Sequence, residues 1–124
     1  MGKVLVVDEF DAITLIVDTF LNMRGYETLT AYDGVTGLKA FMKDRDQIDL
    51  IITDLNMPRM DGLEMLDKIR QSGAKTPAIV MSARSEVDEE RARKVGVAAW
   101  IKKPLESEKV FFSVFEKVLA GSKA

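Results

Sequence analysis

The sequence predicts an α/β protein in which a five-stranded parallel sheet lies between two layers of helices. Short runs rich in β-branched residues alternate with longer amphipathic stretches along the whole chain. The central run, residues 50–52, is apolar without alternation, which is typical of a strand buried on both faces. A chain of 124 residues forms one domain, and five such units require right-handed crossovers between parallel strands. We therefore expect a three-layer α/β/α sandwich spanning residues 1–124.

Five segments are predicted to be strands, at residues 3–7, 27–31, 49–53, 78–81 and 98–101. The strand order 2-1-3-4-5 of flavodoxin-like sheets fits a domain of this size. Each strand is followed by apolar residues at helical spacing, which predicts five helices. Their apolar faces are Ile13, Ile16, Val17, Phe20 and Leu21; Val35, Leu38, Phe41 and Met42; Leu63, Leu66 and Ile69; Val87, Ala92 and Val95; and Phe111, Val114, Phe115 and Val118.

Residues at the helix ends give further expectations. Gly25, Gly73 and Gly96 are expected to end the first, third and fourth helices. Asp11 and Asp61 are expected to cap the first and third helices at their N-termini. Residues 121–124 are expected to form a frayed tail.

The composition excludes several classes of function. The chain contains no cysteine and no histidine, which rules out disulfides, thiolate metal sites and Ser-His-Asp triads. Any metal must bind to oxygen ligands, which favours Mg²⁺, Ca²⁺ or Mn²⁺. A net charge of −2 gives no bulk attraction to nucleic acid or membrane. With no long apolar run and no signal-peptide layout, we expect a cytoplasmic protein.

Polar residues collect where the predicted strands end. Asp8 and Glu9 follow the first strand, Asp54 ends the third, Ser82 follows the fourth, and Lys103 follows the fifth. Parallel strands bring their carboxyl ends to one edge of a sheet, so these side chains should lie together. Clustered carboxylates repel one another unless a cation neutralises them. The pattern therefore predicts a hard-cation site, with Mg²⁺ as the favoured ion.

Each of these residues also has a plain structural interpretation. Asp54 could simply terminate a strand, and Ser82 could be an ordinary turn residue. Lys103 could be a solvated side chain. The occurrence of all of them at four of five strand ends favours a functional site.

Four motifs give the chain a family resemblance. They are V-L-V-V-D-E at residues 4–9, D-L-N-M-P-R-M-D-G at 54–62, M-S-A at 81–83 and K-P at 103–104. Together they are highly specific, and the chain resembles a response-regulator receiver domain of two-component signalling over essentially its whole length. The resemblance implies roles for a set of residues: Asp54 as phosphoacceptor, Asp8 and Glu9 as Mg²⁺ ligands beside Asp54, the Asn56 backbone carbonyl as a further ligand, Ser82 as the switch hydroxyl, and Lys103, before a cis Pro104, as the partner of the phosphoryl group.

The resemblance also implies a mechanism and partners. The phosphoryl donor would be a phosphohistidine on a sensor histidine kinase or a phosphotransfer protein. The domain would catalyse only its own phosphorylation and dephosphorylation. We expect its output to be a protein contact on the fourth helix, fifth strand and fifth helix, with Trp100 as a switch residue. Phe112 lies about 100° around its helix from Phe111, at the margin of the buried stripe. Trp100 and Phe112 are therefore either part of a partner surface or peripheral core residues. We expect a monomer or weak dimer without direct nucleic-acid or membrane binding.

Two residues depart from the family pattern, and other functions remain open. Glu9 replaces the more usual Asp, and Trp100 replaces the more usual Tyr or Phe. One alternative is an Mg²⁺-dependent phosphohydrolase of the haloacid dehalogenase type, although its D-x-D motif is missing. Another alternative is a flavin or nucleotide binder, but this chain lacks the glycine-rich loop that such a binder requires. A degenerate receiver acting as a scaffold is a further alternative, against which the full acidic and lysine set argues.

Overall fold

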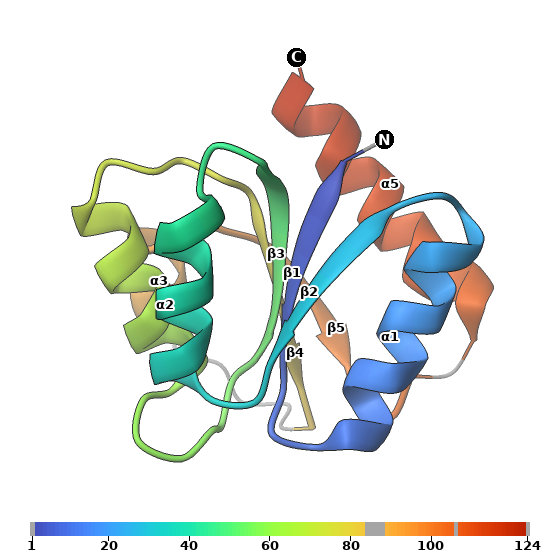
Figure 1. Ribbon diagram of the computed structural model, residues 1–124, viewed down its shortest axis with the longest axis horizontal. Helices are drawn as coiled ribbons and strands as arrows, with labels where there is room; N and C mark the ends of the chain where they lie inside the picture. Colours follow the sequence, from blue (N-terminus) through green and yellow to red (C-terminus); the bar gives the residue numbers. More distant parts are fainter. Residues whose placement is uncertain (1, 84–88, 106, 124) are drawn as a thin grey trace.

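The computed structural model describes residues 2–83, 89–105 and 107–123. Strands and helices alternate without exception in this part of the chain (Figure 1). The strands are β1 Lys3–Val7, β2 Glu27–Ala31, β3 Ile48–Asp54, β4 Ala78–Ser82 and β5 Val97–Lys102. The helices are α1 Asp11–Met23, α2 Gly34–Asp44, α3 Gly62–Gln71, α4 Glu89–Lys94 and α5 Glu108–Lys123.

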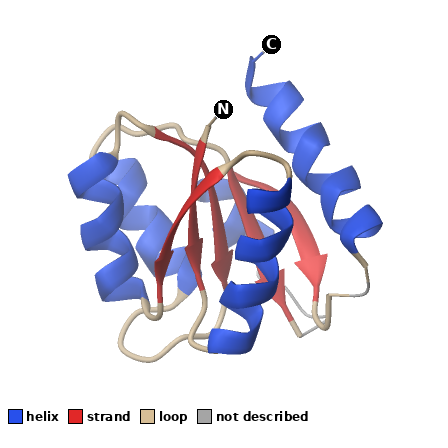
Figure 2. Ribbon diagram, turned by 45° about the vertical axis from the view of Figure 1, so that its right-hand side comes forward, coloured by secondary structure: helices blue, strands red, loops and turns tan. Residues whose placement is uncertain are grey.

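The five strands form one parallel sheet in the order β2-β1-β3-β4-β5, as expected. Helices pack on both faces of this sheet (Figure 2). Two hydrophobic clusters fill the space between the sheet and the helices on its two faces. One joins β1, β3 and β4 to α2, α3 and α4, and the other joins the same strands to α1 and α5. β3 contributes to both, because Ile51 faces the first cluster while Leu50 and Ile52 face the second.

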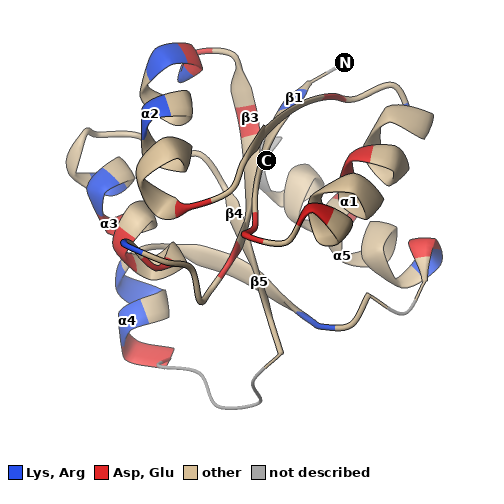
Figure 3. Ribbon diagram, turned by 60° about the horizontal axis from the view of Figure 1, so that its bottom comes forward, with Lys and Arg blue, Asp and Glu red and all other residues tan. Residues whose placement is uncertain are grey.

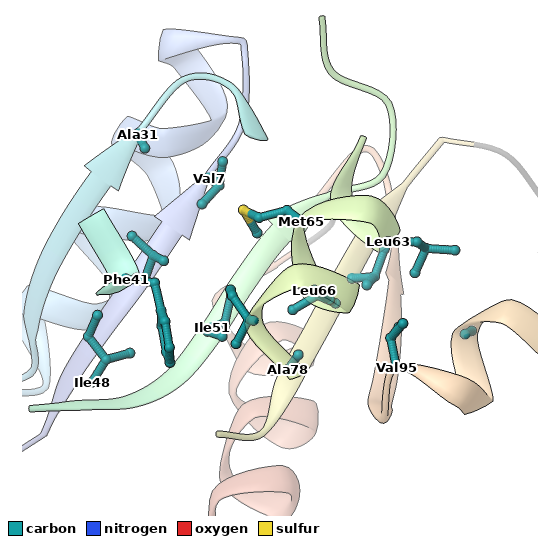
Figure 4. Close-up of a cluster of buried hydrophobic side chains, with 14 residues drawn as sticks. Val7, Ala31, Phe41, Ile48, Ile51, Leu63, Met65, Leu66, Ala78 and Val95 are labelled. Atoms are coloured by element: carbon teal, nitrogen blue, oxygen red, sulfur yellow. The ribbon is translucent and has the colours of Figure 1, made fainter. Parts of the chain in front are cut away.

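The first cluster consists of aliphatic side chains and Met65 around Phe41, its one fully buried aromatic residue. Phe41 of α2 and Leu66 of α3 project toward Ile51 of β3 (Figure 4). The second cluster is more aromatic, because Phe111, Phe112 and Phe115 of α5 contact one another with ring centroids 5.1 to 5.9 Å apart. Phe112 is 2% exposed and belongs to this core, so its expected place on a partner surface is wrong.

The expected element boundaries are close to the observed ones. β1 and β2 have the predicted bounds, and the other three strands extend by one residue at one or both ends. Gly25, Gly73 and Gly96 end their helices with positive φ angles of 85°, 92° and 69°. These angles are readily adopted by glycine, which explains its position there.

Several expectations at the helices are corrected by the structure. Ile16 and Met42 are 39% and 42% exposed, because they lie at the margins of the buried stripes of α1 and α2. Asp11 is the first helical residue of α1, and the cap position is Phe10, which makes no side-chain capping bond. The chain from Gly121 to Lys123, expected to be a tail, continues α5.

Two expectations are limited by what the structure describes. Val87, expected on the fourth helix, and Ala124 lie outside the described residues. Within the described ranges, no helix combines the length and apolarity that crossing a bilayer requires.

Candidate functional site

The candidate site lies at the carboxyl edge of the sheet, where β1 and β3 end side by side. Val7 pairs with Thr53, so the next residues, Asp8 and Asp54, leave the sheet at the same level. Figure 3 shows acidic segments close together near the start of α1 and the loop before α3. Asp8 is fully buried and Asp54 is 5% exposed. Two carboxylates withdrawn from water at neighbouring positions require a positive partner.

Lys103 supplies that positive charge. Its Nζ lies 3.1 Å from Asp54 Oδ1 and 2.5 Å from Asp8 Oδ2. The Lys103 backbone N–H donates to the Ser82 carbonyl at 2.9 Å, and the Lys103–Pro104 peptide is cis, as the resemblance implied. The structure thus brings together Asp8, Asp54 and Lys103, which the sequence had placed at three separate strand ends.

The surroundings of Asp54 make its carboxylate unusually basic. Burial raises the pKa of Asp54, and the nearby negative charge of Asp8 raises it further. The Lys103 ammonium and the Leu55 backbone N–H, which donates to Asp54 Oδ1 at 2.9 Å, act in the opposite direction. Desolvation and like charge therefore exceed the compensation provided by the lysine.

Glu9 and Asn56 are exposed on two loops at the same edge. Among the described residues, no three Asp or Glu side chains come close enough together to hold a metal ion. The expected crowding of Glu9 with Asp8 and Asp54 is therefore not seen; Lys103 contacts the two buried carboxylates instead. The donor set still fits Mg²⁺ chemically, because Asp8, Glu9, Asp54 and the Asn56 carbonyl offer only oxygen ligands.

The loop from residue 55 to 61 connects the phosphoacceptor candidate to α3. Gly62 N donates to the Leu55 carbonyl at 2.8 Å and closes the loop at its base. A Cβ atom on Gly62 would lie 2.2 Å from the backbone oxygen of Asp54, which explains the glycine at this position. Asp61 caps α3 as expected, since its side chain accepts from Glu64 N at 2.7 Å.

Two arginine contacts around this loop could not be foreseen from the sequence. Arg59 Nη2 lies 2.6 Å from Asp33 Oδ2, and both Arg91 terminal nitrogens bond Asp61 at 3.1 and 3.2 Å. Both aspartates are N-caps, of α2 and α3. The Asp-Gly pairs at 33–34 and 61–62 signal these caps, but nothing local in the sequence identifies their arginine partners.

Ser82 and Trp100 lie toward the edge formed by β4 and β5. Ser82 is buried at the end of β4, and its neighbour in register is Lys102. Trp100 is half-buried on β5, packs against the cluster beneath α3 and α4, and lines a groove with Val114 of α5. Trp100 therefore contacts the core on one side and an open surface on the other.

Comparison with known proteins agrees with this geometry. Residues 4–114 match the family described as response regulator receiver domain. The chain is 33% identical over 105 residues to the transcriptional regulatory protein CpxR of Escherichia coli K12, covering 84% of this chain and 44% of that protein. It is 34% identical over 109 residues to the response regulator MprA of Mycobacterium bovis BCG, covering 87% and 46%. The chain thus spans less than half the length of these relatives.

Solved structures give the same result. The chemotaxis response regulator CheY4 of Vibrio cholerae matches with a TM-score of 0.86 and 31% identity, covering 95% of this chain and 98% of that one. A response regulator receiver domain protein of Clostridium thermocellum matches with a TM-score of 0.88 and 26% identity, covering 99% and 98%. With its fold, its edge cluster of Asp8, Asp54 and Lys103, and these matches, the chain belongs to the response regulator receiver domain family.

Proposed function

We propose that Asp54 accepts a phosphoryl group from a phosphohistidine on a histidine kinase or phosphotransfer protein, and that this modification changes a protein-binding surface. The observation that carries the proposal is the buried Asp54 carboxylate at the end of the central strand, 3.1 Å from the Lys103 ammonium. A carboxylate is an established nucleophile for phosphoryl groups. Its raised pKa makes this one more basic than an exposed aspartate.

The transfer uses few groups of this chain. A carboxylate oxygen of Asp54 attacks the phosphorus and forms an O–P bond. The P–N bond of the phosphohistidine breaks, and the imidazole nitrogen leaves with the electron pair. Phosphoryl transfer needs positioning and charge neutralisation more than acid–base catalysis. Lys103 contacts both carboxylates, which supports its proposed role as the partner of a phosphoryl oxygen, and the Ser82 hydroxyl at the end of β4 is the proposed hydrogen-bond donor to another.

Asp8, Glu9, Asp54 and the Asn56 backbone carbonyl would hold Mg²⁺ at this edge. The ion would supply positive charge that offsets the phosphoryl oxygens. Lys103 already pairs with Asp8 and Asp54, so this cation and the ammonium would share the same carboxylates. Because Glu9 is exposed, we expect its side chain to move toward Asp8 and Asp54 when the ion binds.

The proposed output surface comprises α4, β5 and α5. Ser82 and Lys103 lie at the ends of the two strands that border it, so a phosphoryl group that engages both would act on this side of the sheet. Trp100 on β5 lies between the core and the groove beside α5, and its rearrangement would alter that groove. We propose that a downstream protein binds this surface. We further propose that the domain acts in the cytoplasm and does not contact nucleic acid directly.

Phosphorylation can be tested without the cognate kinase. Incubation with acetyl phosphate and Mg²⁺, followed by intact mass measurement, should add one phosphoryl group to the wild type and none to Asp54→Asn. Asp11→Asn, which changes an exposed aspartate near the same edge, is the matched control and should be modified normally. Labelling of Asp54→Asn at the wild-type rate would refute the assignment. Steady turnover of a small phosphate ester would favour a phosphohydrolase, and no labelling at all would favour a scaffold.

A further inference from the structure

The loop that follows Asp54 is attached to the start of α2 by one ion pair. Arg59 Nη2 lies 2.6 Å from Asp33 Oδ2. Asp33 is already ordered as the cap of α2, because its Oδ1 accepts from Thr36 N at 2.7 Å and from the Thr36 hydroxyl at 3.0 Å. The Asp33 side chain is only 15% exposed, whereas that of Arg59 is 63% exposed. The arginine thus binds a fixed acceptor on a neighbouring helix.

Arg59 has an unfavourable backbone conformation. Its φ of 68° is the one positive value among the described non-glycine residues. Met60 N donates to the Pro58 carbonyl at 2.8 Å, so the chain makes a tight three-residue turn centred on Arg59. Such turns are rare and strained for a residue that carries a Cβ atom. A strained turn persists only when surrounding contacts hold it, and the pair with Asp33 is such a contact.

A second contact presses the same part of the loop against α2. A Cβ on Gly34, the first residue of α2, would lie 2.3 Å from the Met60 backbone oxygen. Backbone therefore packs directly on backbone next to the ion pair. At the base of the loop, Gly62 N bonds the Leu55 carbonyl and Leu55 N bonds the Met81 carbonyl. The base is thus fixed by the sheet and α3, while the tip is fixed by α2.

We infer that Arg59 is a positioning residue: its pair with Asp33 holds the loop that carries the Asn56 carbonyl, the proposed ligand of a cation that Asp8 and Asp54 would also hold. This inference rests on the proposed function, because Asn56 is a ligand only if Mg²⁺ binds there. Asn56 lies between the fixed base and the tip of the loop, so its carbonyl direction depends on both attachments. Arg59 itself touches neither the phosphoacceptor nor the ion.

The pair is expected to affect cation binding more than stability. Ion pairs with one well-exposed partner contribute little to folding. Indirect support of a metal ligand, by contrast, often changes metal affinity substantially. Loss of Arg59 should therefore weaken Mg²⁺ binding while leaving the unfolding temperature nearly unchanged.

Three variants separate the ion pair from the turn. Arg59→Ala removes the pair and keeps the strained φ, whereas Arg59→Gly removes the pair and relaxes the turn. Asp33→Asn removes the charge but keeps an oxygen that can cap α2. Titration calorimetry with Mg²⁺ should show an affinity loss of about tenfold for all three, the lower end of what loss of an indirect support of a metal ligand costs. The double variant Arg59→Ala/Asp33→Asn should lose no more than either single variant, as expected for two partners of one contact.

The phosphorylation kinetics provide an independent readout. With acetyl phosphate as donor, the three variants should need more Mg²⁺ for half-maximal rate but reach the wild-type rate at saturation. Lys39→Ala, which removes an exposed basic residue of α2, should match the wild type in every measurement. Unchanged Mg²⁺ affinity in Arg59→Ala would overturn the inference. So would an affinity loss in Arg59→Ala that Arg59→Gly restores, because the turn rather than the pair would then be responsible.

The same measurements distinguish failure of the inference from failure of the proposed function. A wild type that binds Mg²⁺ and is labelled, with variants that behave identically, refutes only the role of Arg59. If replacement of Arg59 weakens Mg²⁺ binding but the wild type is never labelled, only the phosphoacceptor function is refuted. A wild type that binds no Mg²⁺ refutes both.

Discussion

At the scale of single residues, the site combines groups that oppose one another. Asp54 is buried beside a second carboxylate, and burial and the charge of Asp8 raise its pKa. The Lys103 ammonium offsets this only in part. A group whose pKa is raised on folding destabilises the folded state in its charged form. Asp54, the proposed phosphoacceptor, is thus expected to reduce the stability of the folded protein.

We predict that Asp54→Asn stabilises the protein at neutral pH. The destabilising contribution of Asp54 is absent below the unfolded pKa near 3.8 and grows as the pH rises through the higher folded pKa. Urea unfolding of both proteins at several pH values should therefore show a gain at pH 7 that shrinks toward pH 4. Asp11→Asn, at an exposed position, is the control. A variant that is less stable than the wild type at pH 7 would mean that the pair with Lys103 outweighs desolvation.

The sequence predicted some of these residues better than others. Asp8, Asp54 and Lys103 could be placed because each follows an apolar run whose end is clear. Glu9 was expected in the same cluster, but alternation after a strand end does not determine which way a loop side chain points. Arg59 was missed because a positive φ at a non-glycine residue leaves no local signal, and its partner Asp33 is 26 positions away.

At the scale of elements, arginine side chains from α3 and from α4 itself hold α4 against the rest of the domain. In the described part of the chain α4 comprises Glu89–Lys94, and helices in proteins are stabilised mainly by tertiary packing. Ala92 and Val95 pack on the first cluster. The half-buried Arg70 of α3 donates to the Val95 carbonyl at 2.8 Å and the Ala74 carbonyl at 3.2 Å. Burial lowers the pKa of the Arg70 guanidinium, which indicates how far it is withdrawn from water.

We predict that Arg70→Met destabilises the protein more than Arg91→Met. Loss of Arg70 leaves carbonyl groups at two turns without their donor, at a cost of about 1–3 kcal/mol. Arg91 pairs with Asp61, but their side chains are 41% and 31% exposed, so its loss should cost about 1 kcal/mol or less. Urea unfolding gives both values, and hydrogen exchange should show faster opening of α4 in Arg70→Met. Equal losses would indicate that the Asp61 pair is as important as the turn contacts.

The elements themselves were predicted well where packing follows a simple period. β1 and β2 match their expected bounds because each run of apolar and β-branched residues is followed at once or within two residues by an aspartate, Asp8 or Asp33. The prediction that Asp11 caps α1 was wrong. Asp11 is the first helical residue, and the carboxylate that accepts a backbone amide at this helix start is Asp8, which accepts from Phe10 N. α5 is longer than expected because Gly121 lies within the helix and does not end it.

At the scale of the whole molecule, the fold brings the proposed site and the proposed output surface onto neighbouring strands. Parallel strands alone predict that the carboxyl ends share one edge. The strand order was taken from known flavodoxin-like sheets of this size, and it is the order that makes β1 and β3 neighbours and puts β5 at the margin. Because β5 is an edge strand, Trp100 can contact the α3–α4 core and still line the groove beside α5. A change at Ser82 or Lys103 is therefore one strand away from an exposed surface.

We predict that phosphorylation in Mg²⁺ changes the fluorescence of Trp100, the single tryptophan of the chain. The phosphoryl group would engage the Ser82 hydroxyl and Lys103. Trp100 contacts the core on one side and lines a groove on the other, so its side chain could move between a more buried and a more exposed position. Its intensity or its accessibility to a quencher should change on phosphorylation. Ser82→Ala should reduce that change, whereas Thr19→Ala, which removes an exposed hydroxyl on α1, should not. Identical spectra and quenching with and without the phosphoryl group would make Trp100 a fixed packing residue, and the switch would then have to involve another part of the α4–β5–α5 surface.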